Sequence, residues 1–263
     1  ISLGDINLNN KNVVFIMSVD IGGDGRYSSS RSKPYRYSIN SWKKWCEKND
    51  CELFILSDLL LPNDEMGICW QRWYIFDLLE SNGIKYNQVL SVDADTIIHP
   101  DTPNFFNMTN DNFTVVEFDG SWDWVCRSIE NYSKYLFEGR MIEWWKYFDS
   151  GFWIVNEKHK DFAKSMTDFY HNNRDLILQV ENTFHVGTEQ TPLNFMLQLS
   201  DFEVTHLPYE FNMNDMSRKE ILNENLVFTK VGWVYQFNCI PNNEGDKITN
   251  YFMKKTYEHF YGE

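Results

Sequence analysis

The sequence predicts an α/β fold with a mostly parallel central sheet flanked by helices. From the start of the chain, short apolar runs alternate with longer segments in which apolar side chains recur at helical spacing. Apolar runs of this length are typical of parallel strands, because helices cover both faces of such strands. Strands that alternate with helices form parallel sheets with helices on both faces. A hydrophobic content of 43% fits a globular domain and argues against disorder.

The positions of these runs set the expected elements of the first half. Strands are expected at residues 13–17, 53–56 and 113–118, and helices at residues 35–49 and 70–80. After the second helix, a buried strand begins at Gln88 and carries Asp93 and Asp95 at its end. Residues 121–147 are rich in aromatic and charged side chains, so we expect helix and loop beside the sheet.

The second half continues the same alternation. We expect a strand at residues 152–155 that follows a turn at 149–151, helices at 158–172 and 189–199, an edge strand at 204–207, a strand within 227–234 and a closing helix at 248–260. Residues 1–12 are polar and are expected to be a lead-in segment. No repeat, low-complexity block or linker interrupts the sequence, so a single domain over residues 1–263 is predicted.

Composition and charge exclude several function classes. The net charge of −14 argues against a general nucleic-acid binder, because phosphate backbones require stripes of Lys and Arg. A phosphate-bearing ligand would need a local cation instead. No apolar run is long enough for a membrane span. The five cysteines lack metal-finger spacing and are odd in number, which favours a reducing, cytoplasmic compartment. The chain begins at Ile1 rather than Met, which leaves room for an upstream segment.

Asp93 and Asp95 are the first candidates for a functional site. The strand pleat is expected to put both side chains on one side of the chain, where the two carboxylates repel each other unless a cation lies between them. Carboxylate oxygens suit Mg²⁺ or Mn²⁺, and ligands of open α/β sheets collect beyond the carboxyl ends of the strands. The alternative is an ordinary turn at the end of the strand, where Asp is common.

Six segments follow one another in an order and spacing that resemble a known family. They are residues 13–20, residues 71–79 around Arg72, S-V-D-A-D-T at 91–96, D-S-G-F-W-I-V-N at 149–156, E-Q-T-P-L-N at 189–194 and L-P-Y-E-F-N at 207–212. Together they resemble the GT-A glycosyltransferases, nucleotide-sugar-dependent enzymes with one Rossmann-like α/β domain. The form of the third segment is the one common among the retaining, glycogenin-like members.

The resemblance implies a function and a set of site residues. It implies that a sugar is transferred with retention to the hydroxyl of a glycan or other acceptor. The implied donor is a nucleoside-diphosphate sugar, with a UDP-sugar favoured. Mn²⁺ or Mg²⁺ would be held by the D-x-D motif of Asp93 and Asp95. The implied nucleotide- and donor-binding residues are Asp20, Tyr27, Arg72, Asp93, Ala94 and Asp95. The implied catalytic residues are Glu189, Gln190 and Asp149, with Ser150 and Gly151 on the acceptor side.

Several implied residues also have a plain structural alternative. For Asp20 and Tyr27 it is ordinary loop chemistry. Arg72 would be an exposed helix residue that pairs with Asp77 or Glu80. Glu189 would begin a helix after Thr188, because acidic side chains are favourable there. Asp149 would cap the turn before its strand. The aromatic cluster of residues 122, 124, 144, 145 and 147 would be core, or else a face on which an acceptor sugar docks.

The sequence also departs from the family pattern. Gln236 stands where many members have a histidine that binds the metal, and it offers only a neutral carbonyl oxygen as a third ligand. Asp149 stands where Asn is usual, and Glu189 where Asp is usual.

Two other functions remain open. The loop G-G-D-G-R at residues 22–26, followed by Lys33-Pro34, resembles the phosphate-binding loop of sugar-1-phosphate nucleotidyltransferases, although that family has one residue between the last glycine and the arginine. The third reading is a sugar-binding module without catalysis, which the departure at Gln236 allows.

Overall fold

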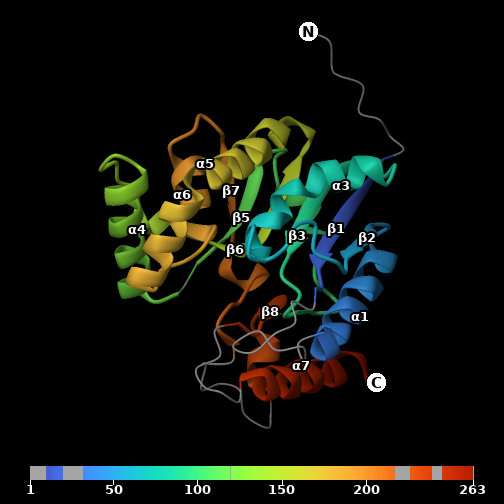
Figure 1. Cartoon of the computed structure of the whole chain (residues 1–263). Coiled ribbons are helices and arrows are strands. Elements are labelled where there is room, and N and C mark those ends of the chain that lie inside the picture. Colours follow the sequence, from blue (N-terminus) through green and yellow to red (C-terminus); the bar gives the residue numbers. More distant parts are fainter. Residues whose placement is uncertain (1–9, 20–31, 119, 217–225, 239–244, 263) are drawn as a thin grey trace.

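The computed structural model describes residues 10–19, 32–118, 120–216, 226–238 and 245–262. Six strands form the central sheet in the order β2-β1-β3-β6-β5-β7 (Figure 1). Their bounds are β1 Lys11–Met17, β2 Glu52–Leu56, β3 Tyr86–Val92, β5 Phe113–Glu117, β6 Phe148–Asn156 and β7 Val204–Leu207. The pairs β1–β2, β1–β3 and β5–β7 are parallel, and β6 is antiparallel to both of its neighbours. The predicted mostly parallel sheet is confirmed, and so is the edge strand.

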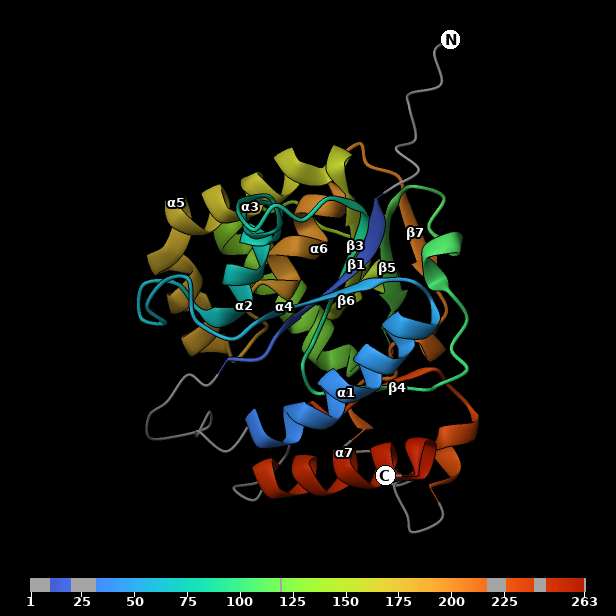
Figure 2. The ribbon, with the colours of Figure 1, turned by 90° about the vertical axis from the view of Figure 1, so that its right-hand side faces the viewer.

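Helices cover both faces of this sheet, as predicted (Figures 1 and 2). Their bounds are α1 Ser32–Lys48, α2 Ile68–Gln71, α3 Ile75–Ser81, α4 Trp122–Leu136, α5 Lys160–Phe184, α6 Gln190–Gln198 and α7 Gly245–Tyr261. Val13 and Phe15 of β1 pack in one core cluster with residues of α2, α3, α5 and α6. Val14 and Ile16 point to the other face and pack with residues of α1. This alternation along a fully covered strand explains its continuous apolar run.

A small two-stranded sheet lies below the central sheet in Figure 1. It pairs β4 (Thr96–Ile98) with β8 (Val234–Gln236) in antiparallel register, with Thr96 opposite Gln236. Ile97 and Tyr235 pack in a core cluster with Met253 and Tyr257 of α7. This sheet carries Gln236 to the turn between β3 and β4 from a point far along the chain.

Several predicted elements differ from the observed ones. The helix predicted at residues 70–80 is interrupted by a 3-10 turn, Arg72–Tyr74. The strand predicted at 227–234 is wrong for most of its length, because Val227–Lys230 form a 3-10 turn and β8 begins at Val234. The helix predicted at 158–172 continues to Phe184, since Ile177 and Val180 bury a further apolar stripe. β1 already begins at Lys11, so the lead-in segment is shorter than predicted.

The largest correction concerns β6, which was predicted to begin at Phe152. It begins at Phe148, so residues 149–151 lie inside a strand and not in a turn. The Asn194 side chain of α6 accepts a hydrogen bond from the Phe148 N–H at 3.0 Å and donates one to its carbonyl at 2.9 Å. These bonds tie the first residue of the strand to α6. Because β6 runs against β3 and β5, its amino end lies at the carboxyl end of both neighbours.

The structure bears on two further expectations, the absence of a membrane span and the reduced state of the cysteines. Among the residues that the structure describes, no helix combines the length and the apolar character needed to cross a bilayer. The described cysteines, at positions 46, 51, 69 and 126, are free thiols. The cytoplasmic location and the single domain stay predictions.

Candidate active site

Asp93 and Asp95 lie in a turn that follows β3. The strand ends at Val92, and the Thr96 hydroxyl donates a 2.7 Å hydrogen bond to the Asp93 carbonyl, which closes the turn. The indole N–H of Trp42 in α1 donates to the same hydroxyl at 2.9 Å. The prediction that a strand pleat aligns the two carboxylates is therefore wrong, because the chain leaves the sheet at Asp93. The alternative, a turn at the strand end, is the observed local structure.

Arg72 connects this turn to two other segments. Its Nη2 donates to Oδ1 of Asp93 at 2.8 Å, and its Nη1 donates to the Ser150 carbonyl at 2.8 Å. Its Nε lies 3.9 Å from Oε1 of Glu189. The side chain is buried, so the alternative of an exposed helix residue is wrong for Arg72.

The aromatic neighbour of Arg72 explains how the arginine reaches this position. Trp73 stacks on Trp153 of β6, with ring centroids 4.6 Å apart and an angle of 2° between the rings. Stacked aromatic pairs of this size contribute about 0.5–1.5 kcal/mol beyond their buried area. The contact holds the 3-10 turn against the sheet and leaves Arg72 at the sheet edge.

Two buried amides complete the surroundings of Asp93. Gln236 Nε2 donates to Oδ2 of Asp93 at 2.8 Å, and Gln236 Oε1 accepts a 3.0 Å bond from Asn212 Nδ2. Oδ1 of Asn212 is buried without a hydrogen-bond partner. Gln236 therefore presents its N–H group to Asp93, and its carbonyl would face a cation there only after the amide had turned over. Asn212 was not predicted as a site residue, although it ends the L-P-Y-E-F-N segment.

Asp149 faces the same amides from β6. Its Oδ1 accepts a 2.6 Å bond from the Gly151 N–H and lies 3.5 Å from Asn212 Nδ2. Burial raises the pKa of Asp149 to about 8, and the nearby charge of Asp93 adds to this effect. The carboxyl of Asp149 is therefore protonated at neutral pH. Asp149 lies within a strand and not before one, but its bond to the Gly151 N–H, two residues further on, is of the local kind that the capping alternative expects.

Glu189 and Gln190 lie at the start of α6 and contact Ser150. Oε1 of Glu189 accepts a 2.7 Å bond from the Ser150 hydroxyl, and Oε2 accepts a 2.5 Å bond from Thr188. Oε1 of Gln190 accepts from the Ser150 N–H at 3.1 Å. Glu189 is 2% exposed, whereas Gln190 is only half-buried. Gln190 Nε2 lies 3.5 Å from the Tyr147 hydroxyl, a neighbour that the sequence did not indicate.

The structure thus gathers most of the predicted residues at one edge of the sheet. The gathered residues are Arg72, Asp93, Asp149, Ser150, Gly151, Glu189, Gln190 and Gln236. Ala94 lies between the two aspartates with its side chain buried. Asp20 and Tyr27, predicted at the nucleotide, lie outside the described residues. Their roles stay predictions.

A hard divalent cation was predicted at this edge of the sheet. Asp93 and Asp95 supply carboxylate oxygens, which Mg²⁺ and Mn²⁺ prefer. The charges of Asp93, Asp215 and Asp95 all contribute to raising the pKa of the buried Asp149, so negative charge accumulates here. Across the described ranges, however, no three His, Cys, Asp or Glu side chains form a group that could hold a metal ion. The metal site stays a prediction.

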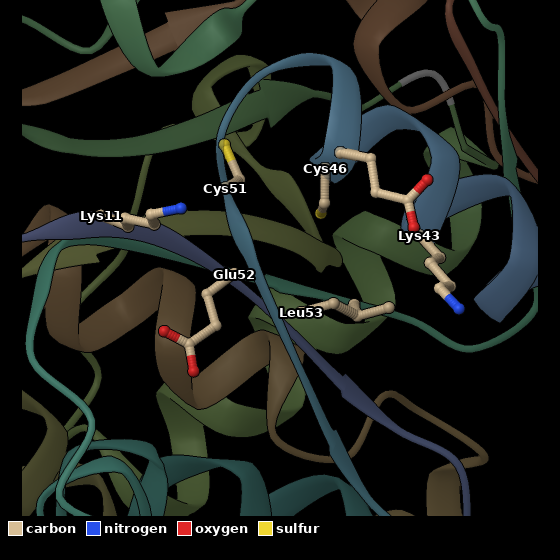
Figure 3. Close-up of a pocket in the computed structure, with 7 residues that line it drawn as sticks. Lys11, Lys43, Cys46, Cys51, Glu52 and Leu53 are labelled. Atoms are coloured by element: carbon tan, nitrogen blue, oxygen red, sulfur yellow. The ribbon is translucent and has the colours of Figure 1, made fainter.

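A separate hollow of about 380 Å³ lies at the opposite edge of the sheet. Figure 3 shows Lys11, Cys46, Cys51 and Glu52 around it. Lys11 and Glu52 are the first residues of β1 and β2, so the hollow lies at the amino ends of these strands. It contains none of the predicted site residues.

The close packing at Gly151 gives a first testable prediction. A Cβ atom at this position would lie 2.5 Å from Oδ1 of Asp149 and 2.7 Å from Nε2 of Gln236. We expect Gly151→Ala to lower the free energy of unfolding by about 1–3 kcal/mol, the usual cost of overpacking. Gly67→Ala is the control, because its Cβ would meet no atom closer than 3.8 Å. Urea denaturation of both variants measures the difference, and equal stabilities would contradict the predicted crowding.

The raised pKa of Asp149 gives a second prediction. The unfolded carboxyl loses its proton near pH 4, whereas the folded one keeps it up to about pH 8. Stability therefore falls as the pH rises between these values, by at most about 1.4 kcal/mol per pH unit for this group. Asp149→Asn keeps the acceptor for Gly151 and cannot ionise, so its free energy of unfolding should fall less steeply over this range.

Denaturation in the presence of a chelator, at several pH values from 5 to 9, measures the two slopes. Glu181 should also make stability fall as the pH rises, because burial and the charge of Glu189 raise its pKa to about 8. Glu181→Gln should also flatten the profile, and the double variant should be flatter than either. A slope that is unchanged in Asp149→Asn would show that this carboxyl is ionised in the folded chain.

Comparison with known proteins bears on the fold. No protein-family model matches this chain, and no curated protein is similar enough in sequence to match it. Among solved structures, it is similar to a glycosyltransferase involved in the glycosylation of the major capsid of PBCV-1, with a TM-score of 0.59 and 8% identity. That match covers 93% of this chain and 99% of the other.

Two further solved structures match less well. The bifunctional glycosyltransferase WbbM has a TM-score of 0.48 and 13% identity, over 93% of this chain and 50% of WbbM. An active-site Gln-to-Glu mutant of LgtC has a TM-score of 0.48 and 11% identity, over 93% of this chain and 95% of LgtC. At this level of identity a likeness concerns the fold, and the first match gives the conclusion: this chain has the α/β fold of a solved glycosyltransferase.

Proposed function

We propose that this chain is a glycosyltransferase that moves a sugar from a nucleoside-diphosphate sugar to an acceptor hydroxyl. One observation carries the proposal: Arg72 joins Asp93, the Ser150 carbonyl and Glu189 at the carboxyl edge of the sheet. The motifs that resemble the GT-A enzymes therefore meet in space although they are far apart in sequence. The likeness of the whole fold to a solved glycosyltransferase supports the same function.

On the donor side, we infer that Asp93 and Asp95 hold Mn²⁺ or Mg²⁺. The ion would neutralise charge on the departing diphosphate. Gln236 is the inferred third ligand, through its carbonyl oxygen once the amide has turned over. The Asn212 amide would turn over with it, so that Asn212 Oδ1, now buried without a partner, accepts from Gln236 Nε2. Arg72 supplies a fixed positive charge beside the phosphates or the donor sugar.

On the acceptor side, Asp149 and Gln190 line the amino end of β6. Burial favours the protonated form of Asp149, so we infer that this carboxyl orients the acceptor hydroxyl through a hydrogen bond. Transfer with retention follows from the family resemblance alone. The buried Glu189 is suited to orienting Ser150 and Arg72, whereas Gln190 is exposed enough to bind sugar hydroxyls. A UDP-sugar donor and a hexosyl type of transfer follow from the family resemblance alone.

Incubation with a panel of UDP- and GDP-sugars plus Mn²⁺ tests this function. Slow release of the nucleoside diphosphate, lost when EDTA is added, is the expected result. Release of pyrophosphate from a nucleoside triphosphate and a sugar phosphate would instead indicate a nucleotidyltransferase. Sugar binding that EDTA does not change, with no turnover of any donor, would indicate a binding module without catalysis.

A further inference from the structure

Three of the ten tryptophans are exposed on one part of the surface. Trp122 is 62% exposed, Trp144 47% and Trp145 64%, whereas half of the tryptophans are buried in the core. Trp122 begins α4, and the other two lie in the 3-10 turn Trp144–Lys146. The expectation that these side chains belong to the core is therefore wrong. Large apolar rings in water are unfavourable, and exposed apolar groups that gather in one place mark binding surfaces.

Trp122 and Trp145 each contact only one other ring of this group, so each keeps at least one face free of the other tryptophans. The ring centroids of Trp122 and Trp144 lie 6.5 Å apart, with an angle of 89° between the rings. Those of Trp144 and Trp145 lie 6.0 Å apart, with an angle of 85°. In an edge-to-face arrangement the rings do not cover one another as stacked rings do. Flat, separate ring faces match the C–H faces of sugar rings, which are apolar on the face and polar at the edge.

This tryptophan platform (Trp122, Trp144 and Trp145) lies beside the candidate active site. Glu117, at the end of β5, pairs with Phe148, so the segments that carry the tryptophans flank the same sheet edge. Trp145 precedes Asp149 by four positions. In Figure 1, α4 lies beside α6, which carries Gln190.

Two aromatic side chains link the platform to the site. Trp124, in the first turn of α4, has its ring centroid 6.3 Å from that of Tyr147. The Tyr147 hydroxyl bonds with Thr191 at 2.8 Å and lies 3.5 Å from Gln190 Nε2. Trp124 and Tyr147 thus connect the start of α4 with the residues proposed to bind sugar hydroxyls.

The surroundings of the platform are polar. Asp123 pairs with Arg127 in α4, and Glu143 pairs with Lys146 beside the other two tryptophans. These exposed groups can donate and accept hydrogen bonds at the edges of a sugar ring.

We propose that the tryptophan platform binds the acceptor, and that the acceptor is a carbohydrate of at least two sugar units. The unit that receives the sugar would lie at Gln190 and Ser150, and a further unit would stack on Trp122 or Trp145. This inference rests on the proposed function for the direction of transfer, but carbohydrate binding at the platform does not depend on it.

Titration of the protein with lactose, maltotriose, chitotriose and mannotriose, followed by saturation-transfer NMR and calorimetry, tests the platform. At least one of these sugars is expected to bind, and Trp122→Ala and Trp145→Ala are expected to weaken that binding about tenfold each. Trp145→Phe should retain most of the affinity, because it keeps an apolar ring. Tyr251→Ala is the matched control, because Tyr251 is 52% exposed on α7 and lies outside the platform.

Donor hydrolysis separates this inference from the proposed function. The tryptophan variants should release nucleoside diphosphate from the donor at the rate of the unchanged chain and lose transfer to the sugar that binds. If the unchanged chain binds a sugar through the platform but hydrolyses no donor, the proposed function fails and the platform stands.

Three results would overturn the inference. One is that none of the four sugars binds the unchanged chain. Another is that the tryptophan variants bind as tightly as the Tyr251 control. The third is a concentration-dependent dimer that Trp145→Ala dissociates, because the platform would then be an interface between two copies of this chain.

Discussion

Replacing Asp93 by Asn is expected to reduce sugar transfer by about 100- to 1,000-fold, which corresponds to a loss of roughly 3–4 kcal/mol of transition-state stabilisation. Asn keeps an oxygen that can accept the bond from Arg72, now at 2.8 Å, but it lacks the negative charge that a divalent cation requires. Nucleotide binding should therefore lose its dependence on Mn²⁺. Calorimetric titration with UDP, with and without Mn²⁺, measures that loss beside the rate of transfer.

Asp101→Asn is the matched control for this variant. Asp101 is exposed and pairs only weakly with Lys48, at 3.3 Å, on the outside of the protein. The control should keep both the rate and the effect of Mn²⁺, and Asp95→Asn should behave like the Asp93 variant. Metal-dependent nucleotide binding that survives in both Asp93→Asn and Asp95→Asn would refute the proposed cation site.

Replacing Arg72 by Met is expected to lower the free energy of unfolding by about 3–5 kcal/mol. Burial alone lowers the pKa of Arg72, but the charges of Asp93 and Glu189 outweigh it, and the pKa is raised. Without the guanidinium, the buried Glu189 loses the cation beside it, and the Ser150 carbonyl loses a donor. Such a loss corresponds to a fall of roughly 6–20 °C in melting temperature for a chain of this size.

Arg127→Met provides the comparison for this large effect. Arg127 forms an exposed pair with Asp123 at 3.6 Å within α4, and pairs of this kind contribute about 0.5 kcal/mol or less. Urea denaturation of the two variants, followed by far-UV circular dichroism, gives both free energies. If Arg72→Met were no less stable than Arg127→Met, the buried charge network would not stabilise the fold.

The local pattern of the sequence was enough to predict most strands and helices. β1, β2, β3 and β5 have short apolar runs, and both faces of β1 pack in core clusters. The prediction was poor where an element depends on a partner far along the chain. The first residues of β6 are held by Asn194 of α6, and the 3-10 turn at Arg72 is held by Trp153. Neither partner is visible from the residues next to these segments.

The candidate site is likewise divided between residues that the sequence predicts and residues whose role depends on distant partners. Asp93 was predictable because its strand has an apolar run and ligands collect where such strands end. Arg72, Asp149 and Glu189 were predicted from the order of motifs that resemble a family. Asn212 was missed, since its role arises from contact with Gln236 in the folded chain, and the contact between Tyr147 and Gln190 was not predicted.

By itself, the sequence determined the α/β class and the position of the aspartate pair after a buried strand. These properties follow from the period of the apolar side chains, which is a local quantity. Only the tertiary structure decided that β6 is antiparallel, that the pKa of Asp149 is raised to about 8 and that three tryptophans are exposed. Strand direction depends on which distant strands pair, and a pKa or an exposed fraction depends on which distant residues cover the side chain. No local pattern of the sequence records either.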